Sequence, residues 1–155
     1  MMNTGFVLHG VLFVIAGILL WRLLAQRAAQ IAYLALAIAH GIGISLVGLF
    51  HGSTAAVEDG TVALHSLGAM LAIIGGNSAA IIVGASVSRR MASFGRTLIA
   101  LGVIGIASLL YLVATGGSAV DGIPERVAVY TVMIAQLVAG VSLLLSRRRI
   151  RGSAG

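Results

Sequence analysis

The chain has 155 residues, of which 59% are hydrophobic and only 9% charged, and its mean hydropathy is +1.10. A soluble domain carries about 25% charged residues, so the composition excludes an ordinary water-soluble globule, including most soluble enzyme folds and any nucleic-acid-binding module. The chain has no cysteine, which excludes disulfides, a thiolate nucleophile and cysteine-ligated metals.

Five apolar stretches are each about as long as the ~18–20 residues that cross a bilayer. They cover residues 5–24, 29–50, 62–87, 97–114 and 126–145. Each is predicted to be an α-helix, because unpaired backbone groups cannot face lipid. The predicted fold is all-α, a bundle of five transmembrane helices in a single domain over residues 1–146, with a basic tail at residues 147–155.

The charges are distributed unequally between the two ends of these helices. Nine arginines and no acid fall on one side, a charge of +9. The other side carries four acids and Arg126, a charge of −3, and together these give the net +6. The positive-inside rule then predicts that the N-terminus is outside and the C-terminus cytoplasmic. The tail arginines are interpreted as a topology determinant, with contact to anionic lipids as the alternative.

The third stretch carries a small residue at every fourth position, a pattern that lets helices approach closely inside lipid. This small-residue ladder consists of Gly68, Ala72, Gly76, Ala80 and Gly84. It is predicted to pack within the bundle, most simply against Gly41 and Ser45 of the second helix. A homo-oligomer or a partner membrane subunit is the alternative.

Several polar residues fall near the middle of the membrane, where each is a functional hypothesis because its burial is costly. This intramembrane polar layer is predicted to contain His40, Asn77, Ser78, Ser108 and Gln136. It could bind a polar group, with His40 as a proton-relay position. The alternative is a set of interhelical hydrogen bonds that only fixes the packing.

A second group of polar residues is predicted at the outer face, where it provides the raw material for a zinc site or for acid–base catalysis. The candidates are His9, His51, His65, Glu58, Asp59, Asp121, Glu125 and Arg126. Their spacing is not a metal signature, so a metal is only a minor possibility and no cofactor is required. Interfacial histidines and acids that face water need no ligand to explain them.

Short motifs along nearly the whole chain resemble the "domain of unknown function 998" family of bacterial and archaeal multi-pass membrane proteins. They are Asn3-x-Gly5, Val47-Gly48-Leu49-Phe50, Leu64-His65 and Gly122-x-Pro-Glu125-Arg126-x-x-x-Tyr130. The resemblance implies a location in the bacterial cytoplasmic membrane and draws attention to His65, Glu125 and Arg126. It implies no activity. The family usually has proline where this chain has His51, and six helices, so we expect an upstream helix or a partner that completes the bundle.

Three functions are consistent with these patterns. The first is a non-enzymatic membrane component that contacts lipid or packs with a partner subunit. The second is an enzyme that acts on a lipid or isoprenoid at the outer face through the histidines and carboxylates. The third is a small-solute or proton pathway through His40, Asn77 and Gln136 in an oligomer.

Overall fold

The computed structural model describes residues 2–116 and 122–152, and all regular structure in these ranges is helical. The helices are α1 (Met2–Leu20), η1 (Trp21–Leu23), α2 (Arg27–Leu49), α3 (Thr54–Glu58), α4 (Val62–Val87), α5 (Ala92–Thr115) and α6 (Gly122–Gly152). Five of them, α1, α2, α4, α5 and α6, are long and apolar enough to cross a membrane. The predicted all-α bundle of five such helices is confirmed.

The helix boundaries differ from the expected ones mainly where polar residues extend a helix beyond its apolar segment. α5 begins at Ala92, ahead of the apolar run, and α6 begins at Gly122 and continues to Gly152. The tail arginines therefore belong to α6, which is 31 residues long. The short helix α3 was not predicted; Ser53 caps it by accepting a hydrogen bond from the Ala56 N–H at 3.2 Å.

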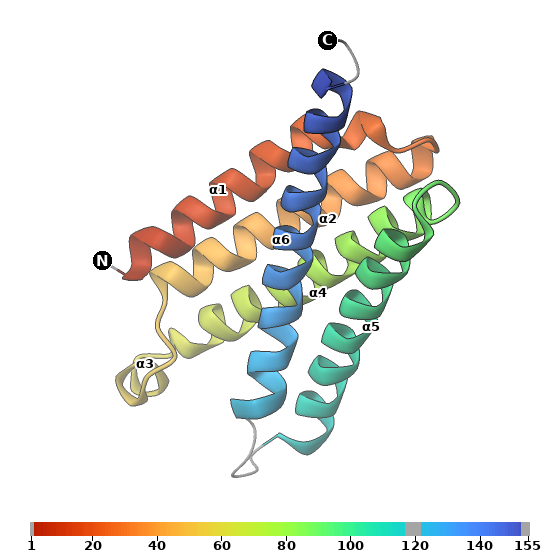
Figure 1. Ribbon diagram of the computed structural model, residues 1–155. Coiled ribbons are helices and arrows are strands. Elements are labelled where there is room, and N and C mark those ends of the chain that lie inside the picture. The colour runs from red at the N-terminus through yellow and green to blue at the C-terminus, as the bar shows by residue number, and fades with distance from the viewer. Residues whose placement is uncertain (1, 117–121, 153–155) are drawn as a thin grey trace.

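α1, α2 and α4 form one layer, and α6 crosses this layer at a steep angle with α5 beside it (Figure 1). α4 is the central helix, because α2, α5 and α6 all pack against it. α1 packs on α2 and on η1, at the edge of the layer. Only 11% of its apolar segment is buried inside the bundle. The bundle is therefore well packed around α4 and open beside α1.

Small residues allow the helices around α4 to approach closely. All five residues of the small-residue ladder are buried. A Cβ added at Gly68 would lie 2.8 Å from the Gly43 oxygen of α2, and one added at Gly84 would lie 2.6 Å from the Gly95 oxygen of α5. A Cβ added at Gly76 would meet Val132 of α6, so the ladder packs within the chain and is shared among α2, α5 and α6.

The residues of α2 that approach the ladder are not the ones expected from the sequence. Gly41 and Ser45 face α1 instead, where a Cβ added at Gly10 would lie 2.6 Å from the Gly41 oxygen and 2.7 Å from Ser45 Oγ. Gly43, two residues along α2 from Gly41, approaches α4. α2 therefore uses small residues on two faces, one for each neighbouring helix.

Candidate functional site

The candidate histidines just after α2 and at the start of α4 each make a contact with a neighbouring element. His51 Nε2 lies 3.1 Å from Asn3 Oδ1, and His65 Nδ1 lies 2.8 Å from the Phe50 carbonyl oxygen, which accepts its proton. These contacts connect the start of α1 and the start of α4 to the end of α2. Both histidines thus have a structural role at this end of the bundle.

Among the described residues, the acidic candidates lie in α3, in the turn that follows it and in the first turn of α6. Asp59 Oδ1 accepts hydrogen bonds from the Thr61 N–H at 2.9 Å and the Thr61 hydroxyl at 2.7 Å, and these bonds lower the pKa of the Asp59 carboxyl. Glu58, Glu125 and Arg126 are exposed, and Asp121 lies outside the described residues. In residues 2–116 and 122–152, no three histidine or acidic side chains are grouped closely enough to hold a metal ion.

Asn77 is the centre of a hydrogen-bonded network between α4 and α6. Its amide nitrogen donates to the Ile73 oxygen at 2.9 Å and to the Ala128 oxygen at 3.0 Å. Its amide oxygen accepts from the Thr131 hydroxyl at 2.9 Å. Asn77 is fully buried, and both donors of its amide are used. This network fixes the packing of α6 on α4.

His9 and His40 lie next to each other, although the sequence suggested different depths for them. Their ring centroids are 5.5 Å apart, and Phe13 covers His40 with its ring centroid at 4.3 Å. α1 begins at Met2 rather than at residue 5, so His9 lies about two turns into the helix instead of one. It is about 9 Å along α1 from Asn3, the contact of His51. The structure therefore places His9 with the intramembrane residue His40, away from the loop histidines.

Three buried nitrogen atoms have no hydrogen-bond partner within the described part of the chain: His9 Nε2, His40 Nε2 and Gln136 Nε2. They come from three different helices, α1, α2 and α6. The other nitrogen of His40, Nδ1, lies 2.7 Å from the Ala72 oxygen. We call His9, His40 and Gln136 the polar triad. An unpaired buried polar atom is costly, so these three side chains are where the described bundle satisfies its polar groups least.

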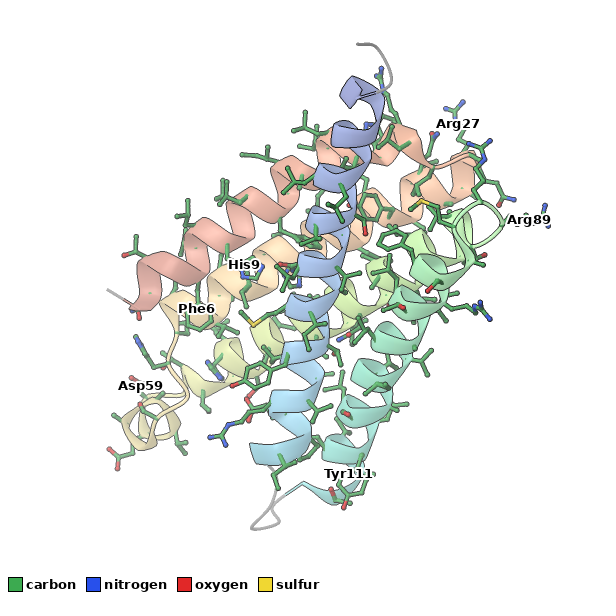
Figure 2. All side chains as sticks on the ribbon, in the orientation of Figure 1. Phe6, His9, Arg27, Asp59, Arg89 and Tyr111 are labelled. Carbon is green, nitrogen blue, oxygen red and sulfur yellow. The ribbon has the colours of Figure 1, made fainter. Side chains whose placement is uncertain are left out.

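A groove with a volume of about 750 Å³ opens between α1 and α6. His9 and Gln136 line it from opposite sides, and most of the other lining is apolar. Figure 2 shows His9 on α1, beside the crossing helix α6. The apolar lining residues are Leu12, Phe13, Ala16, Leu20, Met133, Leu137, Ala139, Gly140, Val141, Leu143 and Leu144, with Tyr33 of α2. This α1/α6 groove lies on the side of the bundle where few residues of α1 are buried.

The α1/α6 groove continues toward the arginine-rich end of the bundle. A smaller pocket of about 210 Å³ shares Leu20, Tyr33, Ala139 and Leu143 with it and extends to Met91. Arg27 and Arg89 lie at this end of the molecule, and Asp59 lies at the other (Figure 2). The groove therefore runs from His9 and Gln136 toward the arginine-rich end of the bundle.

The remaining members of the predicted polar layer lie elsewhere. Ser78 and Ser108 are half-buried and do not line the α1/α6 groove. Thr131, which bonds to Asn77, was missed, because a lone threonine in a membrane helix commonly bonds only to its own backbone. The layer thus divides into a bonded pair, Asn77 with Thr131, and the unpaired polar triad.

Comparison with known proteins gives one family. A family model described as "Protein of unknown function (DUF998)" matches residues 1–142. No curated protein and no solved structure matches the chain.

Proposed function

Because the chain belongs to the DUF998 family of proteins of unknown function, we propose its function from its geometry: it is a non-enzymatic membrane component that binds a lipid chain in the α1/α6 groove. The observation that carries this proposal is the groove of about 750 Å³ between two helices that each have the length and composition of a membrane span. Its volume lies within the ~300–1,000 Å³ of ligand pockets.

The shape and lining of the groove suit a flexible hydrocarbon chain. On α6 the lining extends from Met133 to Leu144, which is about 16 Å along the helix. Helices that associate inside lipid bring small residues together, but Gly10 and Gly17 of α1 are already packed against α2. Of the fourteen residues that line the groove, six are leucine or valine and only three are small, so its walls suit a flexible lipid chain better than another closely packed helix.

The proposal includes an orientation in the membrane. The arginine-rich end of the bundle is placed at the cytoplasmic face, with the N-terminus outside. A lipid whose head group lies near Arg27 and Arg89 would then extend its chain along the groove toward the polar triad. The membrane is proposed to be the bacterial cytoplasmic membrane.

Blocking the groove tests the proposal. Gly140 lines the groove, and a Cβ added there would meet no described atom within 4 Å, so Gly140→Phe fills the groove without a clash at its base. The probe is phosphatidylglycerol with a photoactivatable diazirine on its acyl chain, in vesicles that contain the purified protein. We expect α1 and α6 peptides of the unchanged chain to be labelled and Gly140→Phe to lose most of this labelling.

Gly5→Phe is the matched control, because Gly5 also has no described atom within 4 Å of an added Cβ and lies outside the groove. It should be labelled like the unchanged chain. If α6 peptides are labelled equally in Gly140→Phe and in Gly5→Phe, the proposal is overturned. A native mass spectrum that shows a dimer in place of a lipid-bound monomer, and that loses the dimer in Gly140→Phe, would assign the groove to a second copy instead.

A further inference from the structure

We infer that the lipid bound in the α1/α6 groove is an anionic glycerophospholipid, and that the Tyr33 hydroxyl donates a hydrogen bond to the carbonyl oxygen of its acyl ester. The inference rests on the proposed function and adds the chemical class of the ligand. It depends on two features at the arginine-rich end of the bundle, an open but buried hydroxyl and two basic turns.

Tyr33 of α2 lines three neighbouring cavities. They are the α1/α6 groove, the pocket of about 210 Å³ that continues it, and a cavity of about 70 Å³ that reaches α4 and α5. The Tyr33 side chain is only 8% exposed, and its hydroxyl makes no hydrogen bond with a described residue. In the described chain, the side-chain atoms that are both unpaired and sealed from the surface are nitrogens of His9, His40 and Gln136. The Tyr33 oxygen is not one of them, so it is unpaired and open to the cavities around it.

This hydroxyl gives the pocket a hydrogen-bond donor. Ser142, the other hydroxyl of the lining, already interacts within the chain, and the remaining lining side chains of the 210 Å³ pocket are apolar. A buried tyrosine O–H usually has a partner. A ligand that places an acceptor beside Tyr33 supplies that partner.

The depth of Tyr33 matches the ester level of a phospholipid. Tyr33 lies six residues after Arg27, which is about 9 Å along α2. Helical side chains lean toward the N-terminus of their helix, which for α2 is the arginine-rich end, so the hydroxyl lies closer to the interface than its own backbone does. The polar layer on each side of a bilayer is roughly 5–8 Å thick. A phosphate at the level of Arg27 therefore brings the acyl esters to the level of the Tyr33 hydroxyl.

Two arginine-bearing turns border the same pocket. Leu24 of the lining lies between Arg22 and Arg27 in the chain, and Met91 of the lining directly follows Arg90. These three arginines are exposed. No acidic residue occurs in either turn or in α1, α2, α4 and α5, the helices that the turns join. A lipid phosphate with a net negative charge compensates such arginines, so the two turns favour an anionic head group.

A pair of phosphatidylglycerols that differ only in their chain linkage tests the ester assignment. The full chain is placed in nanodiscs of diether phosphatidylcholine with the diazirine-bearing phosphatidylglycerol, and unlabelled diester or diether phosphatidylglycerol competes for labelling of α1 and α6 peptides. We expect the diester to halve the labelling at an about three- to tenfold lower mole fraction than the diether, the ratio for one hydrogen bond. Tyr33→Phe removes only the hydroxyl and should bring this ratio to near one.

Diester phosphatidylcholine is the third competitor and tests the charge of the head group. It should compete less well than diester phosphatidylglycerol, and 0.5 M NaCl, about the concentration that shortens electrostatic screening to a few ångströms, should narrow the difference. Tyr111→Phe is the matched control for Tyr33→Phe, because it removes an exposed hydroxyl that lines none of the three cavities. It should keep the preference for the diester.

Equal competition by diester and diether in the unchanged chain would overturn the ester assignment and leave the groove proposal intact, as would a ratio that Tyr33→Phe does not change. Equal competition by phosphatidylcholine and phosphatidylglycerol would overturn the anionic head group. Absence of α1 and α6 labelling in the unchanged chain, as in Gly140→Phe, would overturn the groove proposal itself. Tyr33→Phe should unfold at the same SDS content as the unchanged chain, because its hydroxyl has no described partner to lose.

Discussion

Asn77 and Gln136 are both amides inside the bundle, but only one of them is satisfied. Asn77 makes hydrogen bonds with both ends of its amide, to Ile73, Ala128 and Thr131. Gln136, five residues beyond Thr131 on α6, leaves its amide nitrogen unpaired. The same functional group therefore stabilises the fold at one position and leaves a buried donor unpaired at the other.

Removal of the Asn77 amide should destabilise the protein. Asn77→Ala leaves the Thr131 hydroxyl without its acceptor on α4 and opens a cavity, so we expect a loss of about 2 kcal/mol in the free energy of unfolding. Ser78→Ala, next in the chain, should change this free energy by less than about 0.5 kcal/mol. The measurement is equilibrium unfolding in mixed micelles of increasing SDS content. Equal stability of the two variants would contradict the structural role of Asn77.

At the scale of helices, glycine decides which elements can meet and what lies between them. Gly105 of α5 faces the Asn77–Thr131 network, and a Cβ added there would overlap Asn77 Oδ1 and Thr131 Oγ1. Gly140 of α6 faces the groove, where an added Cβ meets no described atom within 4 Å. Both are glycines in an apolar helix, but Gly105 is closely packed against other side chains and Gly140 is not.

The two glycines give a matched pair of substitutions. Gly105→Ala should lower the free energy of unfolding by about 1–3 kcal/mol, because either the network or the α4–α5 distance must change. Gly140→Ala should leave it unchanged or raise it by up to about 1 kcal/mol, because alanine favours the helix and nothing obstructs its methyl group. Both are measured in the same SDS titration. A larger loss for Gly140→Ala than for Gly105→Ala would contradict the packing described for α5 and α6.

For the molecule as a whole, the sequence was sufficient to predict the five long helices but not their rotation about their own axes. Apolar length and the need to pair backbone groups fix the number and approximate limits of the spans. A rotation of 100° per residue then decides whether a side chain faces lipid, a neighbour or a groove. Hydropathy gives little information on this rotation when a helix is apolar all round. His9 therefore could not be paired with His40, nor Gly43 with Gly68, until the helices were placed.

The two ends of the molecule differ in charge, and this difference predicts which end faces the cytoplasm. Arg27 and Arg89 lie at one end and Asp59 at the other (Figure 2). Because the chain has no cysteine, single cysteines can report the exposure of each end without a background. Glu58→Cys should react with a membrane-impermeant maleimide in intact cells, and Arg90→Cys should react only after permeabilisation. The reverse pattern would contradict the proposed orientation.

The position of α1 at the edge of the bundle has a consequence for how any ligand reaches the groove. α1 packs mainly on α2 and on η1, and the α1/α6 groove is lined by α1 from His9 to Leu20 and by α6 from Met133 to Leu144. If the groove binds a lipid as proposed, that lipid would enter laterally from the bilayer, without crossing water. Occupancy would follow the mole fraction of that ligand among the surrounding lipids rather than its aqueous concentration. Diluting the protein in buffer would leave the occupancy unchanged, and diluting it in lipid would lower it.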